Sequence, residues 1–197
     1  MGTNGIDVSN QNGMLDLTKG FSGLDFLIAK VTEGVTFVDA TLAHYQQQAA
    51  LLNIDFGGYH FLHAENEEGE SEALFFLRHF EPKSGIGIWI DYETYGTSPN
   101  DDVEVVSLFS ETIKAHFPQQ KVGLYANLTG MDRLVPLGIS EAVDAFWFAY
   151  PNKQLETPNH PMPPGAAWDI HQYETFAGVD RDYSRWNAGE MRKFFTW

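Results

Sequence analysis

The chain contains eight short apolar segments of strand length, and helical patterns alternate with the first five of them. The segments cover residues 5–9, 26–32, 56–63, 85–93, 121–128, 145–151, 168–174 and 178–184. Such runs are typical of buried parallel strands, because strands that are covered by helices are apolar on both faces. Eight of them in a domain-sized chain predict an α/β fold, a TIM-like barrel.

Amphipathic patterns place helices between the early strands. After the second segment, Asp39 is the expected N-cap of a helix with one apolar face. The residues of that face are Leu42, Tyr45, Ala49 and Leu52. Residues 74–80 repeat this spacing, and Asp101 with Glu104 predicts the capping box of the next helix. The last three segments follow one another without such a pattern, and a proline-rich loop at 157–165 separates two of them. We therefore predict five β/α units followed by three strands with little helical cover, in a single catalytic domain over residues 1–197.

Composition excludes several classes of function. The 197 residues are 43% hydrophobic, which is enough for one sizeable core. The formal net charge of −15 argues against a nucleic-acid partner and against an anionic membrane surface. The absence of cysteine excludes a disulfide framework and a thiol nucleophile. We expect a monomer that has no membrane partner.

The stretch GIGIWIDYETYG at residues 85–96 carries two acids at the end of an apolar run, Asp91 and Glu93. In a strand, residues two apart point to the same side and lie roughly 6.5 to 7 Å apart. Catalytic groups of parallel barrels gather at the carboxyl ends of the strands, where Asp7, Glu33 and Asp180 are also expected. The pattern predicts a ring of acids around one mouth of the barrel.

Crowded carboxyl groups do not all ionise easily, so at least one of them should keep a proton near neutral pH. A retained proton and a nearby negative charge are what the hydrolysis of a glycoside needs. Aromatic residues near the strand ends suit the faces of a pyranose ring. They are Tyr59, Phe61, Trp89, Tyr92, Tyr125, Trp147, Tyr150 and Tyr173. Alternation predicts that Trp89 faces the interior with Asp91, whereas Tyr92 points the other way.

Other interpretations of these residues stay open. An Asp-x-Glu at a strand end can also cap a helix, form a salt bridge or lie in solvent. A metal site is disfavoured because strand parity sends His60 and His63 to opposite faces. His171 is expected to be a structural hydrogen-bonding residue, and Lys30 is expected to pair with one of the acids. The five glutamates of residues 63–73 are expected in a solvated loop and the acidic first turn of a helix.

Eight motifs occur in the order expected for one family of enzymes. They are GIDVS, FLIAKVTEG, GGYHF, IWIDYE, LYAN, FWFAYP, DIHQY and GVDRDYS. The chain resembles glycoside hydrolase family 25 lysozymes, the N-acetylmuramidases common among phage endolysins. This resemblance implies cleavage of the β-1,4 bond between N-acetylmuramic acid and N-acetylglucosamine in bacterial peptidoglycan, with neither a metal nor an organic cofactor.

The resemblance also assigns roles to residues. It implies that Glu93 is the proton donor, and that Asp91, Asp7 and Asp180 are the accompanying catalytic acids. Substrate contacts are implied for Glu33, Tyr59, Phe61, Tyr125, Trp147 and Gln172. Two positions depart from the family pattern: Tyr150 lies one residue early, and Asp182 stands where the family often has asparagine. The extra acid should shift pKa values near Asp180.

The residues predict a mechanism with two possible roles for Asp91, and they leave three alternative functions open. Glu93 is expected to protonate the glycosidic oxygen and then to serve as base toward water. Either Asp91 attacks the anomeric carbon or it orients the substrate's own acetamido oxygen, and both routes predict retention. The alternatives are a chitinase-like hydrolase, a glycan-binding domain without catalysis, and a metal-dependent deacetylase or phosphodiesterase.

The charge and the amino terminus raise a question of access to the wall. Anionic wall polymers should repel a domain of charge −15 at low salt. A wall-binding domain outside this chain, neutral target walls or another niche would each answer this difficulty. No signal peptide is visible, so we expect synthesis in a host cytoplasm followed by release to the cell wall.

Overall fold

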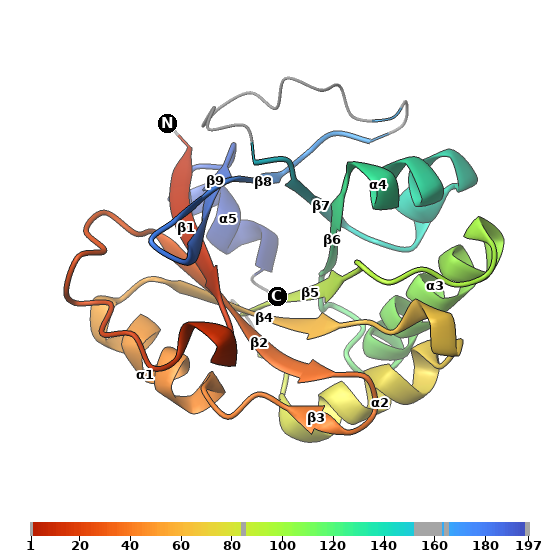
Figure 1. Cartoon of the computed structure of the whole chain (residues 1–197), viewed down its shortest axis with the longest axis horizontal. Coiled ribbons are helices and arrows are strands. Elements are labelled where there is room, and N and C mark those ends of the chain that lie inside the picture. The colour runs from red at the N-terminus through yellow and green to blue at the C-terminus, as the bar shows by residue number, and fades with distance from the viewer. Residues whose placement is uncertain (1, 84–85, 152–162, 164–165, 196–197) are drawn as a thin grey trace.

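The computed structural model describes residues 2–83, 86–151, 163 and 166–195. Within these residues one sheet has the strand order β1-β9-β8-β7-β6-β5-β4-β2-β3, and a further pairing of β1 with β2 closes it into a barrel (Figure 1). The strands are β1 (Thr3–Val8), β2 (Phe26–Glu33), β3 (Phe37–Val38), β4 (Asp55–Phe61), β5 (Ile86–Asp91), β6 (Val122–Asn127), β7 (Ala145–Ala149), β8 (Ile170–Phe176) and β9 (Val179–Ser184). The short β3 extends β2 beyond the barrel. The predicted TIM-like barrel is confirmed.

Helices pack on the outside of the barrel, except the last one, whose Met191 joins the apolar side chains inside it. They are α1 (Leu42–Leu52), α2 (Gly69–His79), α3 (Pro99–His116), α4 (Leu128–Leu134) and α5 (Ala188–Phe195), with the 3-10 turns η1 (Asn10–Asn12), η2 (Ala64–Asn66), η3 (Val135–Leu137) and η4 (Ile139–Glu141). The count of five β/α units is not confirmed, because η1 and turns alone connect β1 to β2. Gly13, Gly20 and Gly23 have φ values of 69°, 85° and 80° in this connection, and such left-handed conformations interrupt a helix.

The strands from β1 to β8 that follow one another around the barrel are parallel, whereas β9 pairs antiparallel with both β8 and β1. A hairpin therefore replaces the last crossover, which agrees, for β8 and β9, with the prediction of little helical cover over the final strands. The predicted proline-rich connection at 157–165 lies outside the described residues apart from Pro163.

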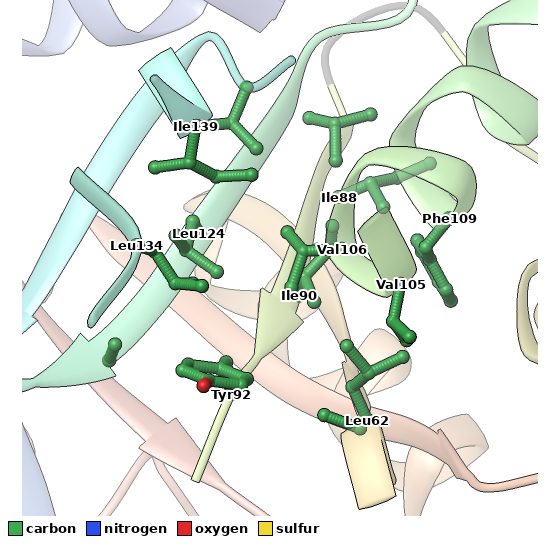
Figure 2. Close-up of a cluster of buried hydrophobic side chains, with 14 of the residues drawn as sticks. Leu62, Ile88, Ile90, Tyr92, Val105, Val106, Phe109, Leu124, Leu134 and Ile139 are labelled. Atoms are coloured by element: carbon green, nitrogen blue, oxygen red, sulfur yellow. The ribbon is translucent and has the colours of Figure 1, made fainter. Parts of the chain in front are cut away.

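Strand alternation divides the apolar residues into an inner and an outer core. Trp89 packs inside the barrel with Trp147, their rings 5.7 Å apart. A Cβ atom at Gly123 would lie 2.2 Å from the Trp89 ring, so the absence of a side chain there makes room for the indole. Tyr92 instead belongs to the cluster between the strands and the helices, beside Leu62 and Ile90 (Figure 2). The predicted orientations of Trp89 and Tyr92 are both confirmed.

Two of the predicted helix starts are displaced. The hydroxyl oxygen of Ser98 accepts the N–H of Asp101 at 3.2 Å, and Pro99 occupies the first turn of α3, so Ser98 and not Asp101 is the N-cap. Asp39 lies in the turn before α1, where Oδ1 accepts the N–H of Thr41 at 2.8 Å. α5 follows the last predicted strand and was not anticipated.

Candidate active site

A cleft of about 560 Å³ opens at the carboxyl ends of the parallel strands. Its lining includes all ten residues for which a site role is predicted, namely Asp7, Glu33, Tyr59, Phe61, Asp91, Glu93, Tyr125, Trp147, Gln172 and Asp180. A larger hollow of about 760 Å³ lies elsewhere, beside α5, and two lysines there already pair with Asp144. Convergent acids make the first cleft the candidate active site, although it is the smaller hollow.

Asp91 and Glu93 form the acidic centre of the cleft. Asp91 is the last residue of β5 and is 8% exposed, and its Oδ1 has no hydrogen-bond partner among the described residues. Burial, followed by the negative charges of Glu93 and Asp7, raises the pKa of Asp91 well above its ordinary value. Glu93 lies two residues further on and is exposed to the cleft. A proton is therefore retained directly beside an accessible carboxyl group.

A second pair of acids comes from β1 and β9. Asp7 is opposite Asp180 in the antiparallel register, so both side chains point to the same face. Gln172 donates a hydrogen bond from Nε2 to Oδ2 of Asp7 at 2.8 Å. Desolvation, followed by the charge of Asp180, raises the pKa of Asp7 to about 7. Thr175 donates to Asp180 from its hydroxyl group.

Asp182 lies on the same face of β9 as Asp180 but deeper in the barrel. It is fully buried, and its Oδ1 accepts the indole N–H of Trp147 at 2.8 Å. Burial, with Asp7 as the next cause, raises the pKa of Asp182 well above its ordinary value. Asp182 also acts on its neighbour, as predicted, since a hydrogen bond with Asp182 is among the smaller causes that lower the pKa of Asp7 against the larger effect of desolvation.

Aromatic side chains form one wall of the cleft. Tyr125 donates to Oε1 of Gln172 at 3.1 Å and meets Trp147 edge to face, with ring centroids 4.6 Å apart. Burial raises the pKa of Tyr59 and of Tyr125, so both phenols are neutral hydrogen-bond donors. Tyr150 does not line the cleft and stacks on Phe148. Tyr150, which lies one residue early relative to the family pattern, is therefore not a residue of the cleft lining.

Tyr173 is a predicted aromatic that lies away from the cleft. It borders a smaller groove on the other face of the β8–β9 hairpin. Its place follows from strand alternation, because the neighbouring Gln172 points into the cleft.

Glu33 is held at the rim by two basic side chains. Nζ of Lys30 lies 2.5 Å from Oε2 of Glu33, and Nε2 of His63 lies 3.2 Å from Oε1. Burial raises the pKa of Glu33, but Lys30 and His63 outweigh it and hold the pKa below its usual range. Nζ of Lys30 also lies 4.8 Å from the centroid of Phe61. The predicted pairing of Lys30 with an acid is confirmed.

The histidines do not share a site. His60 points toward the helices, where its Nε2 lies 2.6 Å from Oε2 of Glu72, whereas His63 reaches the rim of the cleft. Glu70 and Glu72 lie in the first turn of α2, so the predicted acidic first turn is confirmed, although Glu72 is fully buried and not solvated. Nε2 of His171 lies 2.8 Å from the carbonyl oxygen of Tyr150, as expected of a structural residue. The described ranges hold no group of three His, Cys, Asp or Glu side chains that could bind a metal ion.

A buried network fixes the loop that carries Glu93. Tyr92 donates to Oδ2 of Asp102 at 2.6 Å, and the N–H of Gly96 donates to Oδ1 at 2.6 Å. Arg133 on α4 donates from Nε to the same carboxylate at 2.8 Å. The residues on both sides of Glu93 are therefore tied to α3 and α4.

Sequence reasoning missed six residues that line the cleft, namely Ser9, Gln11, Asn12, Lys30, Thr175 and Gly178. Ser9 and Asn12 form a capping box around η1. Their Ser-x-x-Asn spacing is the sequence pattern that could have predicted a turn after β1 at the cleft. Gly178 has a φ of 79° in the β8–β9 hairpin, where its carbonyl oxygen accepts from Nδ2 of Asn12 at 2.7 Å. Lys30 was anticipated as a partner for an acid but not as part of the lining.

The comparisons with known proteins agree with this geometry. The family model for glycosyl hydrolases family 25 matches residues 6–180. An N,O-diacetylmuramidase of Chalaropsis sp is 29% identical over 103 residues, which cover 48% of this chain and 49% of the relative. An autolytic lysozyme of Clostridium acetobutylicum is 32% identical over 72 residues, 36% of this chain and 22% of the relative. The matches thus span half or less of the length of these relatives.

A solved structure shows the same fold. The family GH25 lysozyme from Aspergillus fumigatus superposes with a TM-score of 0.85 at 21% identity, over 100% of both chains. Among the residues described, no helix is long and apolar enough to cross a membrane. Because the family model covers most of the chain, the resemblance of the sequence motifs is confirmed, and this chain belongs to the glycosyl hydrolases family 25.

Proposed function

We propose that the chain is a peptidoglycan hydrolase, an N-acetylmuramidase that cleaves the β-1,4 bond between N-acetylmuramic acid and N-acetylglucosamine. The observation that carries the proposal is the pair at the end of β5, a buried Asp91 with a raised pKa beside an exposed Glu93 in an acidic, aromatic-walled cleft. The names of the Chalaropsis and Clostridium relatives support peptidoglycan as the substrate.

In this mechanism the two carboxyl groups share one proton, and Glu93 delivers it to the glycosidic oxygen, since Glu93 is exposed where a glycan would lie. Asp91 is then ionised during that step. The negative charge of the surrounding acids stabilises the positive charge that develops at the anomeric carbon. Asp91 is adjacent and buried, so it is placed either to attack that carbon or to orient the acetamido group of the substrate. Glu93 then acts as base toward water, and the anomeric configuration is retained.

The other side chains of the cleft have binding roles in this proposal. Neutral Tyr59 and Tyr125 present hydroxyl groups, and Trp147 presents an apolar edge to a sugar ring. Gln172 bonds to both Tyr125 and Asp7, so it links the aromatic wall to the acids. Asp7 and Asp180 complete the charge at the β1–β9 edge, and Glu33 and Phe61 form the opposite rim.

Glu93→Gln tests the assignment of the proton donor. We expect kcat on purified peptidoglycan to fall by about 10²–10⁴-fold, since general acid catalysis contributes about that much, while glycan binding is kept. Mass spectrometry of the wild-type digest should find N-acetylmuramic acid at the new reducing ends. Proton NMR early in the reaction should show the retained anomer.

Other outcomes identify the rival functions. A wild-type protein that binds purified walls and releases no fragments would be a binding domain. Efficient cleavage of chitin oligomers with no action on peptidoglycan would indicate a chitinase-like hydrolase. Activity lost to a chelator would indicate metal-dependent chemistry. An inverted product would remove both routes proposed for Asp91.

A further inference from the structure

Asp182 is a buried acid that the proposed reaction does not use. Its side chain is fully buried and lies behind the cleft lining on β9. Oδ1 accepts a hydrogen bond from Trp147, but Oδ2 has no partner among the described residues. A buried carboxylate with one donor and no counter-ion is costly, because desolvation penalises the charged form.

The acidic neighbour of this carboxyl group is Asp7. Asp182 lies opposite Gly5 in the register of β1 and β9, and Asp7 follows Gly5 by two residues on the same face, so the two carboxyl groups converge inside the barrel and each acts on the pKa of the other. Oδ2 of Asp7 already accepts from Gln172. Two carboxylates both act only as acceptors, so a hydrogen bond between them requires that one holds a proton. The titratable groups that act on Asp182 are Asp7 on β1, Asp180 on β9 and Tyr173 on β8. Asp182 takes part in no ion pair within the part of the chain that the structure describes.

We propose that Asp182 is a positioning residue that keeps its proton and donates it in a hydrogen bond to Asp7, while its other oxygen holds the indole of Trp147. One buried carboxylic acid thereby fixes two residues of the cleft from behind. The inference rests on the proposed function in so far as Asp7 and Trp147 serve a reaction there.

The proton belongs on Asp182 because the two acids have different surroundings. Asp7 is partly exposed to the cleft and has the amide of Gln172 as a donor, and both features favour its ionised form. Asp182 is fully buried from solvent, and its second oxygen has no donor among the residues that the structure describes. Burial is the largest cause that raises both pKa values, but the hydrogen bond between the two groups lowers the pKa of Asp7 and raises that of Asp182, which agrees with a proton on Asp182.

The proposal makes a carboxamide the correct substitute for the acid. In Asp182→Asn, the NH₂ group donates to Asp7 and the carbonyl oxygen accepts from Trp147. In Asp182→Leu, a side chain of similar size offers neither bond. Asp132→Asn serves as the surface control, because Asp132 is exposed on α4.

Thermal unfolding at pH 5 and pH 9 tests the proton without reference to activity. A carboxyl group whose folded pKa is raised contributes stability that is lost as the pH rises toward that pKa. Asp182→Asn should therefore match wild type within about 2 °C at pH 5 and exceed it by about 4 °C or more at pH 9. Asp182→Leu should unfold at a lower temperature at pH 5, and Asp132→Asn should show no pH-dependent difference.

Infrared spectra and kinetics complete the test. At pH 7 the carbonyl band of a protonated carboxyl group should be present in wild type and reduced in Asp182→Asn. At pH 6, kcat/KM on peptidoglycan should stay within about threefold of wild type for Asp182→Asn and fall by about tenfold or more for Asp182→Leu.

Three results would overturn the role of Asp182. They are a stability difference that does not grow with pH, an unchanged infrared band, and an asparagine variant as impaired as the leucine variant. A wild-type protein without activity on peptidoglycan would refute the proposed function instead, and the unfolding and infrared measurements would still decide the state of Asp182.

Discussion

At the scale of single residues, Asp91 shows how burial favours a retained proton, which the proposed acid catalysis needs. One oxygen of its carboxyl group has no hydrogen-bond partner in the described part of the chain, and the group lies beside Glu93 and Asp7. The cleft therefore keeps a proton at a pH where isolated carboxyl groups have lost theirs. Because the pKa of Asp91 is raised and not lowered, the proton stays in the cleft, and activity should persist, toward neutral pH. It should fall as the pH rises through the raised pKa, because the last proton beside Glu93 is then lost.

Asp91→Asn tests that account through its pH profile. The substitution removes the carboxyl group whose raised pKa keeps a proton in the cleft, so the alkaline limb of kcat should move to lower pH. It also removes the proposed nucleophile or orienting group, and kcat at the optimum should fall by about 10²-fold or more. Steady-state rates on purified peptidoglycan from pH 4 to 8 give both quantities. An alkaline limb that keeps its position would show that Asp91 does not govern the proton.

The residues of the candidate site could be predicted where strand alternation and the position of the strand ends decide which side chains face the cleft. Asp7, Asp91 and Asp180 sit at positions where alternation requires an inward side chain, and all three line the cleft. Asp182 has the same parity as Asp180, but only the depth of the barrel separates a cleft residue from one behind it. The sequence does not encode that depth locally.

At the scale of elements, α3 and α4 hold the loop that carries Glu93. Asp102 on α3 is fully buried and joins Tyr92, Gly96 and Arg133. Removing the charge of a buried ion pair leaves its partner uncompensated, which costs about 3–5 kcal/mol when both partners are buried. The side chain of Arg133 is 24% exposed and can still reach water, so the cost here should be smaller, about 2 kcal/mol.

Asp102→Asn should therefore lower both stability and kcat. We expect the midpoint of urea unfolding to fall, and kcat to fall by about tenfold with a smaller change in KM, because the displaced loop carries the proposed proton donor. Asp101→Asn is the matched control, since Asp101 is only half-buried and its carboxylate accepts a hydrogen bond from the Thr97 hydroxyl group at the start of α3, outside the buried network. Equal losses of kcat in the two variants would contradict the proposed role of the buried network.

The elements themselves followed from the sequence where local patterns decide them. All eight barrel strands lie within about two residues of their predicted bounds, because apolar runs mark buried strands directly. The absence of a helix between β1 and β2 could have been predicted from Gly13, Gly20 and Gly23, which adopt positive φ values there, only by setting them against the expected alternation of strands and helices. The sequence did contain a pattern that predicts α5, the capping-box spacing of Asn187 and Glu190. In the structure the side chain of Asn187 accepts the N–H of Glu190, and the side chain of Glu190 accepts the N–H of Asn187.

At the scale of the whole molecule, the charge of −15 opposes the approach to an anionic cell wall. The acids of the cleft add to this field at the place where the substrate must enter. Repulsion of this kind acts over about 10 Å at 0.1 M salt and about 30 Å at 0.01 M. The rate of attack on a charged wall should therefore depend on salt before any contact forms.

The final prediction concerns this salt dependence. The initial rate of turbidity loss of walls that carry anionic polymers should rise several-fold when NaCl increases from 0.01 M to 0.1 M, because screening removes the repulsion. The same walls stripped of those polymers are the control, and their rate should change little over that range. If the rate on the anionic walls falls steadily with salt, attraction and not repulsion governs the encounter. A cationic surface patch or a cationic wall component would then have to outweigh the net charge of the domain.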